Sequence, residues 1–171
     1  ISMGGYDYWI LKLTSKGMIE WDKSYGGSGD EEATSIEKTN DGGYIVAGLS
    51  KSKDGDISDP NVEGGFWIIK INQNGDIEWD KSLGGNHYEF ATSIQQTYDG
   101  GYIVAGNKMF SREGKTDRDY LIVKLYPDEN QVIQSDSSGL FSIEMSPENI
   151  KKLNLTHPKG NEKFLVGSNM A

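Results

Sequence analysis

The sequence contains no cysteine and only two histidines in 171 residues. The absence of cysteine excludes disulfide bonds, thiolate nucleophiles and cysteine-ligated zinc. Basic residues are also scarce, because 17 lysines and arginines stand against 26 acidic residues and the formal net charge is −9. This charge disfavours nucleic acid and anionic membrane surfaces as partners. No apolar run is long enough to span a membrane, so we also expect no membrane insertion.

Glycine and aromatic residues are plentiful. The chain has 22 glycines, 11% aromatic residues and 35% hydrophobic residues, a composition typical of a folded protein. It begins with Ile1, Ser2 and Met3 and shows no signal peptide, so we expect a processed chain or a fragment of a longer one. The lack of cysteine fits an exported bacterial protein, and we therefore predict a secreted or cell-surface location.

An internal repeat organises the chain. The sequence DGGYIVAG occurs at residues 41–48 and again at 99–106, an offset of 58 residues. The same offset relates three further pairs: Trp9 and Trp67, Trp21 and Trp79, and ATSI at 33–36 and 91–94. Repeats of this length are structural units that bury their apolar faces against their neighbours. The four tryptophans are therefore predicted to pack between units.

Each repeat reads as four short strands. Alternating or β-branched residues predict the strands, and the Lys-Gly, Asp-Gly and Asn-Gly pairs between them predict tight turns with positive φ. The predicted strands are 6–13, 19–24, 33–39, 44–49, 66–71, 77–82, 90–97, 102–106, 119–126, 131–136, 140–145 and 163–168. Longer polar loops are predicted at 50–65 and 107–118. A short helical insertion is predicted at 146–161, where Ser146 and Pro147 suit a helix start.

Four-stranded units at this period are typical of propeller blades. We therefore predict an all-β fold of β-propeller-type four-stranded blades in about three repeats. Residues 1–136 would form two and a half repeats, and 137–171 a degenerate last repeat. Propellers have roughly 4 to 8 blades, so three explanations stay open: a fragment of a longer propeller, a ring completed by two copies, or an open array with a capped end. We favour the first.

Three segments carry a resemblance to a known group. SKGMIEWDKSYGG, ATSIEKTNDGGYIVAG and YWILKL resemble the propeller repeats of secreted proteins from Bacteroidetes and related bacteria, over residues 6–126. They are more distantly similar to the eight-bladed propellers of quinoproteins. The resemblance implies whole blades at 33–82 and 90–136, with two outer strands from the N-terminus and two inner strands from the C-terminus. Quinoprotein enzymes hold a quinone and Ca²⁺ in a complete ring, for which this chain has too few blades.

Loops at one edge of the units vary between repeats, whereas the turns at the other edge are alike. The variable loops lie at 26–32 and 84–89 and at 50–65 and 107–118, which places them on one face of an up-and-down unit. Binding residues concentrate on such loops, although drift in unconstrained loops is the alternative. The candidate ligand-binding residues are Asp30, Glu31, His87, Tyr88, Phe110 and Arg112. Exposed aromatic, amide and imidazole groups suit sugar or peptide recognition.

The loop sequence DGDISD contains the carboxylates of Asp54, Asp56 and Asp59. Alternating carboxylates beside a glycine can gather oxygen ligands for Ca²⁺, although this run lacks the bidentate glutamate of an EF-hand. A solvated acidic loop is the alternative, so we expect either no cofactor or Ca²⁺. The adjacent acidic residues at 30–32 have no predicted burial or partner that would make them general acids.

The sequence therefore favours a non-catalytic extracellular module for binding or adhesion, with a glycan or protein ligand. Its partners would include a second copy of the chain or the rest of a longer chain. Two alternatives stay open: a fragment of a quinoprotein-like oxidoreductase, and a structural spacer or stalk of a large surface protein.

Overall fold

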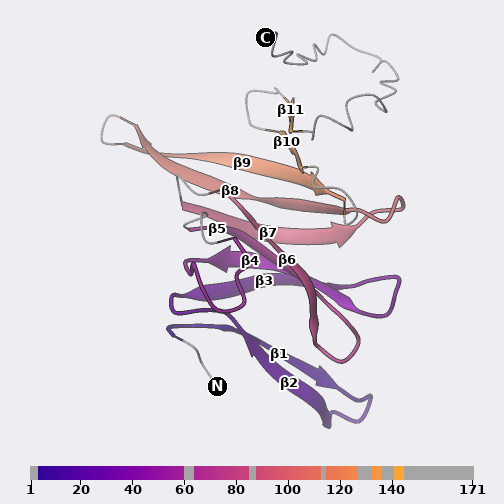
Figure 1. The fold of residues 1–171 in the computed structure, drawn as a ribbon. Helices are drawn as coiled ribbons and strands as arrows, with labels where there is room; N and C mark the ends of the chain where they lie inside the picture. Colours follow the sequence, from indigo (N-terminus) through magenta and orange to yellow (C-terminus); the bar gives the residue numbers. More distant parts are fainter. Residues whose placement is uncertain are drawn as a thin grey trace.

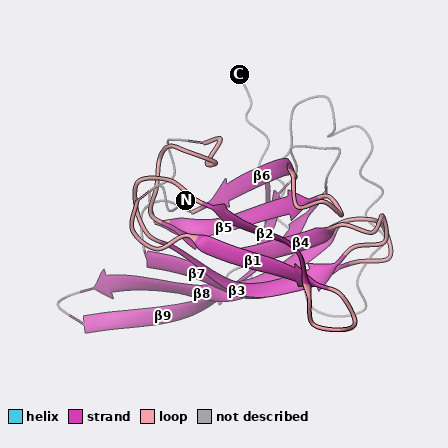
Figure 2. Ribbon diagram, turned by 90° about the horizontal axis from the view of Figure 1, so that it is seen from below, coloured by secondary structure: helices cyan, strands magenta, loops and turns pink. Residues whose placement is uncertain are grey.

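The structure is a computed structural model that describes residues 4–59, 64–84, 88–112, 115–126, 132–135 and 141–144, with side chains described at 4–59, 64–84, 88–109 and 118–126. This part of the chain is all-β, and Figure 2 shows it as strands and loops alone. The strands are β1 (Tyr8–Leu13), β2 (Ile19–Tyr25), β3 (Glu31–Lys38), β4 (Tyr44–Ser50), β5 (Gly65–Ile71), β6 (Ile77–Leu83), β7 (Tyr88–Gln96), β8 (Tyr102–Arg112), β9 (Lys115–Leu125), β10 (Val132–Ser135) and β11 (Phe141–Glu144). No helix long and apolar enough to cross a membrane occurs among these residues.

The strands form three antiparallel sheets, which Figure 1 shows one above the other. β1 and β2 form a two-stranded sheet, β3 to β6 a four-stranded sheet in sequence order, and β7 to β11 a five-stranded sheet. We call these the first, middle and last sheets. The predicted grouping of 33–82 into one four-stranded unit is confirmed, and so is the separate pair of strands at the N-terminus.

The end of the last sheet differs from the prediction. The strand expected at 140–145 was assigned to a further unit, but β11 pairs with β10, with Val132 opposite Glu144 and Ser135 opposite Phe141. Consecutive antiparallel strands joined by a short connection usually pair with each other, which explains the fifth strand. The predicted helical insertion at 146–161 and the strand at 163–168 lie outside the described residues.

The repeated DGG sequence forms the turn between the first two strands of the middle and last sheets. Gly42 has a φ of 88° and Gly100 a φ of 82°, as the turn prediction required. The Asp41 carboxylate accepts hydrogen bonds from the backbone N–H of Gly43 and from the hydroxyl of Thr39. The last sheet repeats this arrangement with Asp99, Gly101 and Thr97. The repeat thus conserves a turn together with the side chains that fix it.

The repeated ATS sequence forms a β-bulge. The register shifts between Ala33 and Ser35 opposite β4, and between Ala91 and Ser93 opposite β8. The hydroxyl of Thr34 lies 3.0 Å from the Ala47 carbonyl oxygen on β4 and 2.8 Å from the Ala91 carbonyl oxygen on β7. The bulge therefore links the middle sheet to the last one.

Two apolar clusters lie between the sheets. One joins the first and middle sheets and includes Tyr8, Trp67 and Trp21, with the rings of Tyr8 and Trp67 4.7 Å apart. The other joins the middle and last sheets and includes Trp79. Trp67, Trp21 and Trp79 thus lie where two sheets pack against each other, the position predicted for them. For Trp9 the prediction is wrong, because 65% of Trp9 is exposed on the outer face of β1, where no described sheet covers it.

Each repeat has a lysine at the same position, and each of these lysines forms an ion pair with carboxylates of its own sheet or turn. In the middle sheet the buried Lys70 ammonium lies 2.9 Å from the Asp41 carboxylate and 2.6 Å from that of Glu78. Burial opposes the charged form, but the two carboxylates outweigh it and raise the pKa of Lys70. The equivalent lysines in the outer sheets are shown with one carboxylate each: Lys12 with Glu20, and Lys124 with Asp99.

The last sheet contains a long hairpin where a polar loop was predicted. β8 and β9 stay in register to Arg112 opposite Lys115, and Figures 1 and 2 show the hairpin extending past the neighbouring strands. The loop expected at 107–118 is therefore wrong. Its polar composition is compatible with a strand because a hairpin that extends past the sheet need not bury either face.

Candidate functional site

Two of the predicted variable loops lie against each other beside the first strand of the middle sheet. The backbone N–H of Gly26 donates to the Asp56 carboxylate at 3.0 Å, and that of Ser28 donates to the Asp54 carboxylate at 2.7 Å. The Gly29 N–H donates to the Ser52 hydroxyl at 2.8 Å. Loop 26–30 and loop 51–59 therefore form one hydrogen-bonded unit, as the prediction of a common face required.

Glu31 holds this unit together. The sequence predicted an open loop at Glu31, but this residue is only 2% exposed. The reason is that β3 begins at Glu31 and turns its side chain inward. One carboxylate oxygen accepts from the Gly27 N–H at 2.8 Å. The other accepts from the hydroxyl groups of Ser50 and Ser52 and from the N–H groups of Lys51 and Ser52. Glu89, at the same position of the next repeat, is buried as well.

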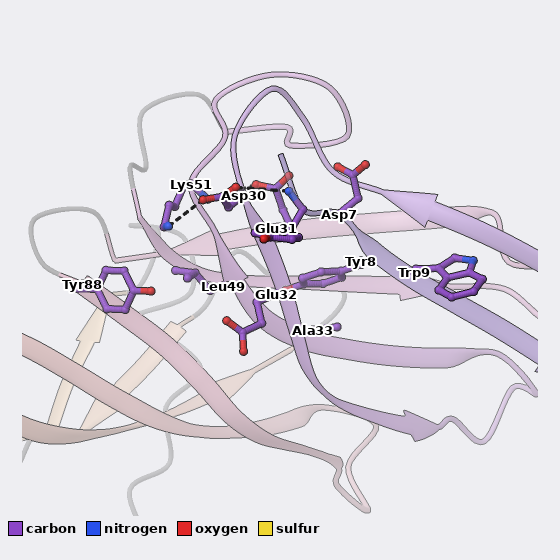
Figure 3. A pocket seen from close by; sticks show the side chains of 11 residues that line it. Asp7, Tyr8, Trp9, Asp30, Glu31, Glu32, Ala33, Leu49, Lys51 and Tyr88 are labelled. Atoms are coloured by element: carbon purple, nitrogen blue, oxygen red, sulfur yellow. Dashed lines mark hydrogen bonds and ion pairs between the residues drawn. The ribbon is translucent and has the colours of Figure 1, made fainter. Parts of the chain in front are cut away.

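A pocket of about 510 Å³ opens beside this anchor, and we call it the loop pocket. It lies where β3 and β7 begin and is lined by Tyr6, Asp7, Tyr8, Trp9, Asp30, Glu31, Glu32, Ala33, Leu49, Lys51 and Tyr88. Figure 3 shows Tyr88 and Trp9 at opposite ends, with Tyr8 and Glu32 between them. A second pocket of about 400 Å³ shares Glu32, Leu49 and Tyr88 and continues along β3 and β7. Residues from all three sheets thus contribute to one concave surface.

The charges of the loop pocket are mostly negative. Lys51 is the only cation among the described residues that line it, and its ammonium lies 3.0 Å from the Asp30 carboxylate, a contact drawn in Figure 3. Hydrogen bonds from Lys51 and from the Tyr6 N–H lower the pKa of Asp30, and the same ion pair raises the pKa of Lys51. Burial, followed by the charges of Glu31 and Glu32, raises the pKa of the Tyr8 hydroxyl. The pocket therefore presents an ion pair beside several further carboxylates.

Exposed aromatic rings border the same pocket. Tyr6, Trp9 and Tyr88 are among the large exposed hydrophobic side chains of the described chain, and all three line it. Tyr88 is supported from behind by Phe90, with ring centroids 6.1 Å apart. Open rings next to carboxylates and an ammonium can stack on an apolar face and hydrogen-bond hydroxyl groups of the same ligand.

The structure brings together three of the predicted ligand-binding residues: Asp30, Glu31 and Tyr88. His87 lies outside the described residues. Phe110 and Arg112 lie on β8 and not on a loop, and their side chains are outside the described part. Sequence reasoning did not select Tyr6, Glu32 and Lys51 as ligand-binding residues. One signal was available, because Asp30 and Tyr88 occupy the same position in successive repeats and both line the pocket. Glu32, two residues from Asp30, was therefore a candidate as well.

The predicted calcium ligands Asp54 and Asp56 accept backbone hydrogen bonds from loop 26–29, and Asp59 lies at the end of the same loop. Among the residues that the structure describes, no group of three or more histidine, aspartate or glutamate side chains is arranged to hold a metal ion. The calcium site stays a prediction.

No family model matches the sequence, and a search of curated proteins finds no match. What the loop pocket binds must therefore be inferred from the side chains that line it.

Proposed function

We propose that the chain is a non-catalytic, extracellular β-propeller-type module that binds a neutral or amino-bearing glycan in the loop pocket. The propeller assignment is supported by the four-stranded middle sheet, whose strands follow one another in sequence order, and by its packing against sheets of the same repeat. The bacterial cell surface is the location we propose for it, on the grounds of its acidity and lack of cysteine.

One observation supports the ligand class: exposed aromatic rings and an ion pair border the same open pocket. A sugar ring has an apolar face that stacks on Tyr or Trp and a rim of hydroxyl groups that both donate and accept hydrogen bonds. The Asp30 and Glu32 carboxylates accept such bonds, and the Lys51 ammonium donates them. The excess of carboxylates over the single lysine disfavours anionic sugars, because an added anion would meet like charge.

The experiment is a binding screen with neutral oligosaccharides and amino sugars, followed by titration calorimetry of each hit. Tyr88→Ala removes the ring at the open end of the pocket, and we expect it to weaken binding about tenfold or more. Tyr98→Ala is the matched control, because Tyr98 is a fully exposed aromatic residue between β7 and β8 that does not line the pocket. Equal affinities of the two variants would place the ligand elsewhere, and binding of no neutral or amino sugar at millimolar concentration would reject the ligand class.

A further inference from the structure

The middle sheet shows which faces of a repeat unit require a neighbour. On the side toward the first sheet it presents Trp67, Ile69 and Ile71, and on the side toward the last sheet it presents Phe66, Ile68 and Ile45. All six side chains are fully buried. Each unit of this repeat therefore has two apolar faces, one for the preceding unit and one for the following unit.

The first sheet exposes the face that the middle sheet buries. Trp9, Leu11 and Leu13 correspond to Trp67, Ile69 and Ile71 at the 58-residue offset. They are 38% to 65% exposed on the outer side of β1. We call this set the first end face. Its partners on β2 follow the same pattern, since Ser24 lies opposite Trp9 as Ser82 lies opposite Trp67.

The last sheet exposes the opposite face. Ile103 corresponds to Ile45 at the 58-residue offset, and Tyr120 and Ile122 correspond to Phe66 and Ile68 at the 54-residue offset that relates Lys70 to Lys124. These three side chains are 41% to 73% exposed on the outer side of β8 and β9. We call this set the last end face.

We propose that the first end face of one copy of the chain docks on the last end face of a second copy. The contact would repeat the one inside the molecule, where Phe66 and Ile68 of the middle sheet share a cluster with Leu121 and Val123 of the last sheet. Leu121 and Val123 occupy the repeat positions of Trp9 and Leu11, and Phe66 and Ile68 those of Tyr120 and Ile122. Each new contact thus pairs side chains at repeat positions that already fit each other.

This interface is heterologous, because the two surfaces are different parts of the chain. Such head-to-tail contacts close into a ring or continue as a filament, depending on the rotation between successive copies. β1 extends this surface with an open strand edge, because β2 is its only partner among the described strands. The equivalent β5 pairs on both sides. An apolar face beside an open strand edge is a recognised site of association.

The experiment measures the mass of the full chain by light scattering and sedimentation equilibrium from about 1 to several hundred micromolar, a range that covers weak homotypic contacts. We expect association that rises with concentration. Leu11→Ser on the first end face and Ile122→Ser on the last end face should each raise the dissociation constant about tenfold or more. Circular dichroism and thermal melting of each variant verify that it is folded, and Tyr98→Ser, which changes neither end face, should associate as the unaltered chain does.

Mixing the two variants distinguishes this interface from a symmetric one. The Leu11→Ser chain keeps an intact last end face and the Ile122→Ser chain an intact first end face, so an equimolar mixture should form heterodimers with nearly the original affinity. A symmetric interface would give no such recovery. The proposal is overturned by a chain that stays monomeric throughout the range, by folded variants that associate undiminished, or by a mixture that fails to recover.

Discussion

The substitution Glu31→Gln tests whether the buried carboxylate is the anchor of the two loops. Glu31 accepts five hydrogen bonds at 2.8 to 3.2 Å, all from neutral donors. Glutamine keeps one acceptor oxygen but turns an NH₂ group toward the Gly27 N–H, which leaves buried donors unsatisfied at a cost of about 1–3 kcal/mol. Bonds to the retained oxygen lose their charge and about half their strength. We expect a total loss of about 3 kcal/mol from the free energy of unfolding.

Urea denaturation followed by tryptophan fluorescence measures this loss, because Trp67 and Trp21 lie in the cluster between the first and middle sheets. The matched control is Glu32→Gln, which makes the same chemical change at the exposed neighbouring residue and should alter the free energy of unfolding by less than about 0.5 kcal/mol. Faster amide hydrogen exchange at Gly27 and Ser52 should accompany Glu31→Gln. A loss for Glu31→Gln no larger than that of the control would refute the anchoring role.

Two other predictions follow from the repeat. Trp67→Ala should lower the free energy of unfolding by about 3–5 kcal/mol, because it empties a fully buried site. Trp9→Ala, at the same repeat position, should change it by less than about 0.5 kcal/mol in dilute solution, and equal losses by urea denaturation would contradict this. The Thr39 hydroxyl and Lys70 lower the pKa of Asp41 to about 2. Stability from this ion pair is therefore present above pH 4 and lost as the pH falls toward 2. Asp41→Asn should remove about 0.2–1 kcal/mol at neutral pH, and the difference should vanish in acid melts.

The sequence predicts the sheets well because strands at equivalent repeat positions have similar sequences, so each strand is identified twice. The strands at 33–39, 44–49, 66–71 and 77–82 agree with β3 to β6 to within two residues. The turn glycines and the close approach at Gly48 also follow from residue type, since a Cβ atom at Gly48 would lie 1.9 Å from the Glu32 carbonyl oxygen. Each of these constraints is local and depends only on the residues of one repeat.

The candidate site was harder to predict because it depends on register at the start of β3. Asp30, Glu31 and Glu32 look equivalent in a loop, but in a strand successive side chains point to opposite sides. Glu31, the first residue of β3, therefore points inward to the backbone N–H groups, although all three carboxylates line the pocket. The recurrence of a buried glutamate at Glu89, 58 residues later, was the signal that this residue belongs to the interior pattern.

Position in the array explains what residue type alone does not. Trp9 and Trp67 have similar neighbours in sequence, YWILKL and FWIIKI, but only Trp67 has a described sheet over it. The same reasoning applies to Lys12, Lys70 and Lys124, because only the middle lysine is shown between two carboxylates. Stability in repeat arrays is the sum of unit and interface contributions, so the middle sheet should open last and the outer sheets first.

The outer sheets, for which a lower stability is expected, link the two proposals. The loop pocket takes Tyr6 and Trp9 from the N-terminal segment and β1, Asp30 from the loop before β3, Glu32 from β3, and Tyr88 from the last sheet. Its shape therefore depends on how firmly the outer sheets are held against the middle one. Docking at the first end face would cover Trp9, which also lines the loop pocket. Association and ligand binding should then compete for the Trp9 ring, and a ligand that stacks on this ring should weaken association.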